Sequence, residues 1–228
     1  MAETGHPQSP ERGASTYGAS VTSLVLFSRN FIKHPRMLGS LIPSSRFLVN
    51  RLLDQVDWAR ANTIIEYGPG VGTFTGQILR RLRPDGTVVA IDTNRDFARY
   101  LTRTLRDDRL HVVEGSAADA HDNLRERGLG RADYVISGIP YSTMDPALRE
   151  RILQTTHDVL QPDGSFLVYQ FTRAVLPHLR QVFPDVQTEF EPRNIMPARL
   201  FYCRRSPDRK NGNGRREPRP RARTTSDR

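Results

Sequence analysis

Residues whose types and spacing suit ligand binding gather in one short stretch. Residues 63–75 read TIIEYGPGVGTFT, an apolar run that contains one acid, Glu66, and is followed by glycines at positions 68, 70 and 72. Glycines at alternate positions let the backbone approach a ligand where a side chain would collide. A second apolar run, GTVVAID, ends in Asp92. These features predict a ligand-binding loop with two carboxylates nearby.

The loop does not match either common phosphate-binding pattern. A triphosphate loop needs Gly-Lys-Ser/Thr at the helix start, but residues 72–74 are Gly-Thr-Phe. A dinucleotide loop needs Gly or Ala at the third position of G-x-G-x-x-G, where Thr73 stands, although Asp92 suits its ribose-binding acid. A ligand without phosphate is the third reading, and Asp92 can accept hydrogen bonds from both hydroxyls of a ribose.

Alternating apolar runs and helical patterns must position these residues. Strands that are apolar on both faces and separated by helices predict a doubly wound, mostly parallel α/β sheet. Its ligand lies beyond the carboxyl ends of the strands, where the first glycine turn sits. The expected strands are 62–67, 86–92, 110–115, 132–138, 164–171, 186–190 and 199–203, with helices near 73–83, 94–108 and 145–160.

The net charge of +9 is concentrated on the flanks. Residues 204–228 hold ten Arg/Lys and three Asp/Glu, and residues 12–53 hold six Arg/Lys and no acid. Such flanks can bind phosphates on nucleic acid or on lipid headgroups; an arginine bias throughout the chain is the alternative reading. Residues 1–20 and 206–228 are expected to be disordered, and 54–205 to form the α/β domain. Residues 21–53 are expected to form an amphipathic helical cap, which either lies on anionic lipid or only covers the domain.

The rest of the composition favours a cytoplasmic protein. There is one cysteine, no apolar run long enough to span a bilayer and no signal peptide pattern. The histidines are scattered, so no metal site is expected. Peripheral association with a membrane would follow from the reading in which the flank lies on anionic lipid. The oligomeric state is not indicated.

Two motifs carry a resemblance to a known family. The residues EYGPGVG and VVAIDTN resemble motif I and the second strand of class I S-adenosylmethionine (SAM) methyltransferases. The resemblance implies a Rossmann-like seven-stranded sheet, SAM as cofactor, and a pairing of Glu66 with the SAM ammonium. The segment ISGIPYS, at 136–142, resembles the N-I/L-P-Y/F motif of amino-directed methyltransferases, including the ribosomal RNA adenine dimethylases. Gly138 replaces the asparagine that holds a planar adenine amine, which disfavours an RNA substrate.

Residues 25–205 are also similar to bacterial phospholipid N-methyltransferases and ornithine-lipid N-methyltransferases. The matching pieces are FIKHPRMLGSLIPSSRFL, SGIP, the segment DPALRERILQTTHDVLQPDGSFLVYQFT, and NIMPARLFYCRR. The resemblance implies methyl transfer from SAM to the amine of a phospholipid such as phosphatidylethanolamine, or of an aminolipid, at an anionic membrane surface. It also implies that residues 39–45 cover the cofactor. Ribosomal RNA adenine N6-methylation is the alternative.

The expected site follows from these motifs. Tyr141 is expected to be catalytic, either as an aromatic face for the methylated cation or in proton removal; Tyr169 is a second such face or plain core packing. Ser116 stands where the family has an acid on the adenine amine, so that contact falls to it, to Ala117 or to Asp119, which could instead cap a helix. The expected cofactor-binding residues are Glu66, Gly68, Gly70, Gly72, Asp92, Ser116, Ala117 and Ser137.

Overall fold

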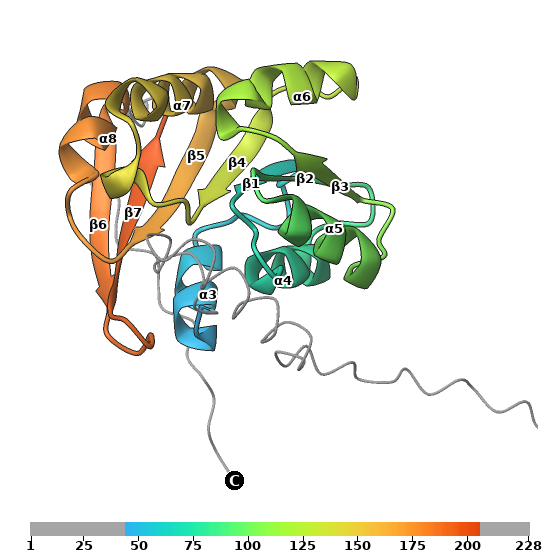
Figure 1. The fold of residues 1–228 in the computed structure, drawn as a ribbon, viewed down its shortest axis with the longest axis horizontal. Helices are drawn as coiled ribbons and strands as arrows, with labels where there is room; N and C mark the ends of the chain where they lie inside the picture. Colours follow the sequence, from blue (N-terminus) through green and yellow to red (C-terminus); the bar gives the residue numbers. More distant parts are fainter. Residues whose placement is uncertain (1–43, 206–228) are drawn as a thin grey trace, which may run out of the picture.

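A computed structural model describes residues 44–205, which form one seven-stranded sheet with helices on both faces (Figure 1). The strand order is β3-β2-β1-β4-β5-β7-β6. The first five strands pair in parallel, whereas β7 is antiparallel to both β5 and β6. The strands are β1 (Thr63–Tyr67), β2 (Thr87–Asp92), β3 (Leu110–Glu114), β4 (Ala132–Ser137), β5 (Leu160–Gln170), β6 (Asp185–Glu191) and β7 (Ala198–Arg204). The predicted doubly wound, mostly parallel sheet is confirmed.

The helices divide between the two faces of the sheet. On one face lie α3 (Arg46–Leu53), α4 (Thr73–Arg81) and α5 (Arg95–Thr104), and on the other α6 (Ala120–Glu126), α7 (Pro146–Val159) and α8 (Leu176–Val182) (Figure 1). Two short 3-10 helices, η2 (Ala117–Asp119) and η3 (Tyr141–Thr143), follow β3 and β4. Each crossover therefore carries the chain back to the amino ends of the strands, and β1 to β5 all end at the opposite side of the sheet, which we call the carboxyl edge.

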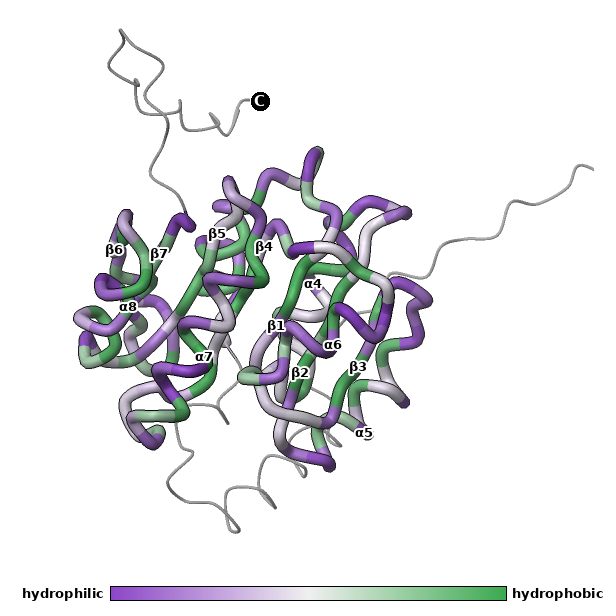
Figure 2. The backbone as a smooth tube through the Cα atoms, turned by 90° about the horizontal axis from the view of Figure 1, so that it is seen from above, coloured by the Kyte–Doolittle hydropathy of each residue, from purple (hydrophilic) through white to green (hydrophobic). Residues whose placement is uncertain are grey.

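Both faces of the central strands are buried, which explains their continuous apolar sequence. Along β1, Ile65 and Tyr67 belong to the cluster beneath α6, α7 and α8, while Ile64 belongs to the cluster beneath α3 and α4. Figure 2 shows the same arrangement, with hydrophobic strands in the middle and hydrophilic segments around them. Glu66 lies between these apolar neighbours on a fully buried strand, so its position is set by the sheet rather than by its polarity.

Of the expected helical cap over 21–53, residues 44–53 lie within the described part of the chain. Ser45 caps α3 by accepting a hydrogen bond from the Leu48 N–H. One face of α3 is buried against β5, β7 and the turn at Trp58, through Leu48, Val49, Leu52 and Leu53. The rest of this segment, and the expected disordered regions 1–20 and 206–228, lie outside the described residues.

Candidate cofactor and substrate site

The glycine loop after β1 has a backbone that only glycine accommodates well. Gly68, Gly70 and Gly72 all have positive φ, at 70°, 57° and 82°. A Cβ on Gly68 would lie 2.7 Å from the Ile139 side chain, and one on Gly72 would lie 2.5 Å from the Leu101 side chain. The loop thus packs closely against Ile139 and Leu101. Because the glycines carry no side chain, a ligand can approach their backbone directly.

Asp92 joins this loop to the end of β2. Its Oδ2 accepts a hydrogen bond from the Gly70 N–H at 3.1 Å, and its Oδ1 accepts one from the Asn94 N–H at 2.8 Å. Burial raises the pKa of this carboxyl, and the two backbone hydrogen bonds oppose that rise. Each oxygen has a second lone-pair site, so the carboxylate can also accept two hydroxyl hydrogen bonds.

Glu66 is a second buried carboxyl at the same edge. Its Oε2 accepts a hydrogen bond from the Thr75 hydroxyl at 2.7 Å, from the first turn of α4. Burial raises the pKa of Glu66 from 4.5 to about 7, with the hydrogen bond from Thr75 acting against the rise and the negative charge of Asp92 adding to it. A buried acid whose proton affinity is raised by burial and by the charge of a second acid is a site that favours a bound cation.

The turn after β3 contributes small residues. Ser116 caps η2, its hydroxyl accepting a hydrogen bond from the Ala118 N–H at 3.1 Å, and Ala117 is buried beside it. The Gly115 N–H donates to the Asp92 backbone carbonyl at 2.9 Å, which ties this turn to β2. Asp119 does stand at the start of α6, but its carboxylate makes no capping hydrogen bond and pairs with Arg151 at 2.8 Å instead.

Tyr141, expected to be catalytic, is fully buried. Its hydroxyl lies 3.0 Å from the Ser137 hydroxyl, and its ring contacts Phe166 edge-on in the cluster beneath α7. Burial raises the pKa of this phenol well above its usual range. In this conformation neither face of the ring is open to a substrate, and Ser137 is engaged with Tyr141. The catalytic role of Tyr141 therefore stays a prediction that would require the ring to move.

Tyr169 lies on the opposite face of the sheet, next to Gly138. A Cβ on Gly138 would lie 2.1 Å from the Tyr169 hydroxyl oxygen, so this hydroxyl takes up the space in which any side chain at position 138 would begin. The ring stacks on Phe74 of α4, with centroids 5.1 Å apart. Burial raises the pKa of Tyr169 to about 12, against the effect of a hydrogen bond with Ser44. At neutral pH the hydroxyl is therefore uncharged and able to donate or accept.

These residues meet at the carboxyl edge, as the topology requires. Parallel registers align the ends of the strands, pairing Tyr67 with both Ile91 and Ser137. A loop of bare backbone, a carboxylate with free lone pairs and a buried acid that favours a cation fit the chemistry of SAM, which has a ribose, an ammonium and no phosphate. Residues that the sequence reasoning missed support the site: Thr75 binds Glu66, Phe74 supports Tyr169, and the Gln170 amide donates to the Ile139 carbonyl at 2.8 Å.

Comparison with known proteins agrees with this geometry. A family described as "Methyltransferase domain" matches residues 64–164. An ornithine lipid N-methyltransferase of Singulisphaera acidiphila is 34% identical over 181 residues, which cover 78% of this chain and 94% of that protein. A ribosomal RNA small subunit methyltransferase A of Acidithiobacillus ferrooxidans is 28% identical over 122 residues, but the match covers only 40% of that protein.

Solved structures share the fold at low identity. The O-methyltransferase TomG of Streptomyces achromogenes, in complex with SAM, aligns with a TM-score of 0.59 at 15% identity, covering 78% of this chain and 88% of TomG. A methyltransferase from Geobacter sulfurreducens aligns with a TM-score of 0.55 at 16% identity, covering 82% of this chain and 93% of that structure.

The sheet, the glycine loop and these matches define a class I SAM-dependent methyltransferase, so SAM is the methyl donor. Within that class, the chain belongs to the family of the ornithine lipid N-methyltransferase, because the match covers 94% of that protein and 78% of this chain. The resemblance to ribosomal RNA methylases is weaker and partial. Among residues 44–205, none of the helices has the length and apolar character needed to span a bilayer.

Proposed function

We propose that this chain transfers methyl groups from SAM to the amine of an aminolipid or phospholipid headgroup at a membrane surface. Ornithine lipid and phosphatidylethanolamine are the headgroups to compare, because both present a primary alkyl amine. The observation that carries the proposal is the contact between Gly138 and Tyr169. The Tyr169 hydroxyl occupies the space next to Gly138, the position at which adenine-directed enzymes are expected to have an asparagine side chain.

The chemistry of the two amine types explains why this matters. The exocyclic amine of adenine has a delocalised lone pair and needs a planar hydrogen-bonding side chain to orient it. An alkyl amine is already a good nucleophile once neutral, so its enzyme needs only to deprotonate, position and desolvate it. A neutral Tyr169 hydroxyl can accept a hydrogen bond from the amine N–H and leave the lone pair free for the methyl group. Its ring, stacked on Phe74, offers an aromatic surface for the methylated cation.

The cofactor contacts are proposed on the same basis. Asp92 would bind the ribose hydroxyls, Glu66 would pair with the ammonium, and the glycine loop would approach the ligand with backbone alone. Ser116 and Ala117 would line the adenine pocket. Ser137 and Tyr141 would support the β4 turn from beneath. SAM bound there supplies an electrophilic methyl group, and the residues of this chain hold the acceptor amine in line with it and exclude water.

The test offers the full chain three acceptors with methyl-labelled SAM: detergent micelles containing ornithine lipid, micelles containing phosphatidylethanolamine, and unmodified ribosomal RNA. We expect label in at least one lipid. Tyr169→Phe should lower the rate of lipid methylation roughly ten- to hundred-fold while SAM affinity stays the same, because only the acceptor loses a hydrogen bond.

Tyr134→Phe is the matched control, since the Tyr134 hydroxyl accepts a hydrogen bond from the Asp57 N–H near the other end of β4. Label in RNA and in neither lipid would refute the proposal. Equal rates in the two tyrosine variants would leave the lipid activity standing but remove Tyr169 from it.

A further inference from the structure

The turn that joins β6 to β7 exposes apolar side chains at its tip. Phe190, Ile195 and Met196 are 47%, 72% and 37% exposed. Among residues 44–205, only one other large apolar residue is comparably exposed, Leu148 on α7. We call Phe190, Ile195 and Met196 the hairpin tip. An exposed apolar cluster of this kind marks a contact surface rather than ordinary scatter.

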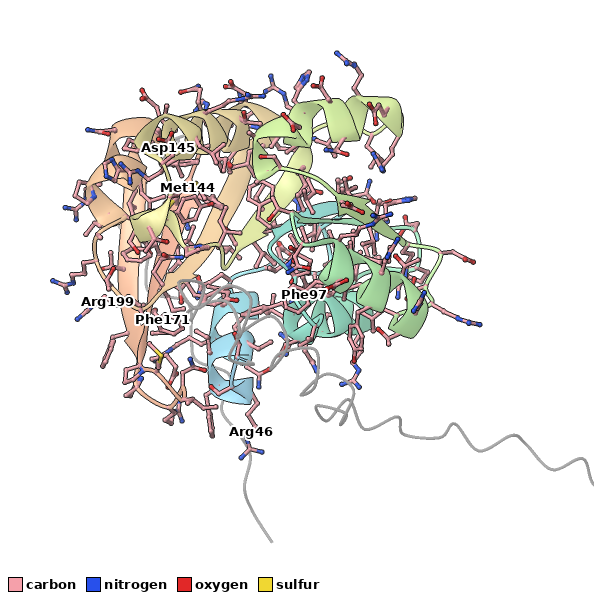
Figure 3. All side chains as sticks on the ribbon, in the orientation of Figure 1. Arg46, Phe97, Met144, Asp145, Phe171 and Arg199 are labelled. Carbon is pink, nitrogen blue, oxygen red and sulfur yellow. The ribbon has the colours of Figure 1, made fainter. Side chains whose placement is uncertain are left out.

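Arginines surround the hairpin tip. The Arg199 guanidinium lies 5.1 Å from the Phe190 ring centroid, and those of Arg193 and Arg46 lie 4.3 and 4.9 Å from the Phe47 ring centroid. Within the described residues, Arg46 and Arg199 have no carboxylate partner, and Figure 3 shows Arg46 pointing away from α3. Glu191 is buried and pairs with Arg193 and Arg51, and the partly exposed Glu189 also pairs with Arg51, so the charges of Arg46 and Arg199 are not offset by these acids. The surface around the tip is therefore positively charged.

Buried polar contacts hold the hairpin tip in this exposed arrangement. The Asn194 side chain accepts from the Ser45 N–H at 2.7 Å and donates to the Met196 carbonyl at 2.9 Å. Glu191 accepts hydrogen bonds from both Arg193 and Arg51. Because these groups fix the backbone of the turn, the outward position of Ile195 and Met196 follows from the fold and is not a loose end of the chain.

The hairpin tip lies at the same edge of the sheet as the proposed site. β6 runs parallel to β5, because both are antiparallel to β7, and so β6 ends at the carboxyl edge. Arg199 pairs in register with Gln170, the neighbour of Tyr169, and the turn lies beside the N-terminal end of α3 (Figure 1). A surface that bound the hairpin tip would therefore lie on the same side of the sheet as the proposed acceptor site at Tyr169.

We propose that the hairpin tip and its arginines form a contact with an anionic phospholipid bilayer, in addition to the one expected of the amphipathic segment that precedes α3. Ile195 and Met196 enter the apolar boundary of the bilayer, and Arg46, Arg193 and Arg199 lie at the level of the phosphates. Aliphatic side chains at the centre of the patch favour a bilayer over nucleic acid, which would reward stacking rings instead. The inference rests on the proposed lipid function, since it orients the site toward the headgroups.

The test measures binding of the full chain to vesicles by sedimentation, without turnover. Vesicles of phosphatidylcholine with phosphatidylglycerol are compared with vesicles of phosphatidylcholine alone. The double variant Ile195→Ser with Met196→Ser should bind the anionic vesicles about ten-fold more weakly. Arg46→Gln and Arg199→Gln should each weaken binding about five-fold. All of these positions are surface-exposed or partly so, and unchanged SAM affinity checks that each variant is folded.

Two controls match these variants elsewhere on the chain. Leu148→Ser removes a similarly exposed apolar residue (39%) from a helix on the other face of the sheet. Arg60→Gln removes an exposed arginine that precedes β1, at the opposite edge. Both should bind vesicles like the wild type.

Equal vesicle binding by the hairpin variants and the wild type would refute the contact, even if lipid in micelles is methylated. Weaker binding of the arginine variants to RNA, with vesicle binding unchanged, would assign the patch to nucleic acid. Loss of vesicle binding in a chain that methylates neither lipid would support the contact while refuting the proposed function.

Discussion

Replacing Glu66 with glutamine should make the cofactor-free protein more stable at alkaline pH while weakening SAM binding. In the fold, burial raises the pKa of Glu66 from 4.5 to about 7. Between these values the folded state binds more protons than the unfolded state, so the free energy of unfolding falls as the pH rises. The decline is complete above the folded pKa, because both states are then ionised.

The size of the effect follows from the pKa difference. One pKa unit corresponds to about 1.4 kcal/mol, so ionised Glu66 lowers the free energy of unfolding at pH 8 by about 3 kcal/mol relative to a neutral side chain. Glutamine has nearly the same shape and can still accept the hydrogen bond from Thr75, which limits the loss of packing. It cannot pair with an ammonium as a carboxylate does, so SAM affinity should fall.

Urea unfolding at pH 5 and pH 8 measures this effect, with fluorescence of the single tryptophan, Trp58, as the signal. Trp58 packs against the cluster beneath α3 and donates a hydrogen bond to the Leu53 carbonyl, so unfolding exposes it. The wild type should lose about 2.5 kcal/mol more than Glu66→Gln between the two pH values, because a small part of the effect is already present at pH 5, above the unfolded pKa. Glu126→Gln on α6 is the control for loss of one exposed carboxylate. Parallel pH profiles for wild type and Glu66→Gln would show that Glu66 is already ionised at pH 5, and the reasoning would fail.

Two further substitutions test the cofactor loop. Asp92→Ala should abolish SAM binding, measured by calorimetry. The control is Asp133→Ala, which removes a carboxylate that accepts hydrogen bonds from the Asn62 and Thr63 N–H groups at the opposite edge and should leave SAM binding unchanged. Equal SAM affinity in the two variants would overturn the assignment of Asp92. Gly72→Ala should lower the free energy of unfolding by roughly 1–3 kcal/mol, because it combines a left-handed backbone with a contact to Leu101. Gly128→Ala has a similar φ of 63° and open space around it, so a loss as large as that of Gly72→Ala would mean that the contact with Leu101 contributes nothing.

Much of the fold could be predicted because its signals are local. An apolar run that ends in glycines predicts a buried strand followed by a turn, and the expected strand 62–67 differs from β1 (Thr63–Tyr67) by one residue. Alternation with helices predicts a mostly parallel sheet, whereas the order of the strands comes from the structure. The glycine loop and Asp92 could be placed together for the same reason, since parallel strands bring their carboxyl ends to one edge.

The roles of the two tyrosines could not be predicted, because they depend on which face of the sheet each ring lies. Position 141 follows the end of β4 and looked well placed for a substrate, yet its turn directs the ring into the core beneath α7. Tyr169 looked like core packing on a central strand, but it lies on the α4 face, where the missing side chain of Gly138 leaves room for its hydroxyl. No spacing rule links residues 138 and 169, which meet only because β4 pairs with β5.

The sequence by itself determined the class of protein, because the glycine loop and the strand that ends in Asp92 resemble motifs of SAM methyltransferases, and such local motifs can be read from neighbouring residues alone. The tertiary structure decided the properties that depend on distant neighbours. Burial between two helix layers gives Glu66 its raised pKa, and the missing side chain at Gly138 leaves room for the Tyr169 hydroxyl. The backbone of the hairpin tip is held by distant residues. Asn194 accepts a hydrogen bond from the N–H of Ser45, the N-cap of α3, and Glu191 accepts one from Arg51 of α3, which lie 149 and 140 residues earlier in the chain.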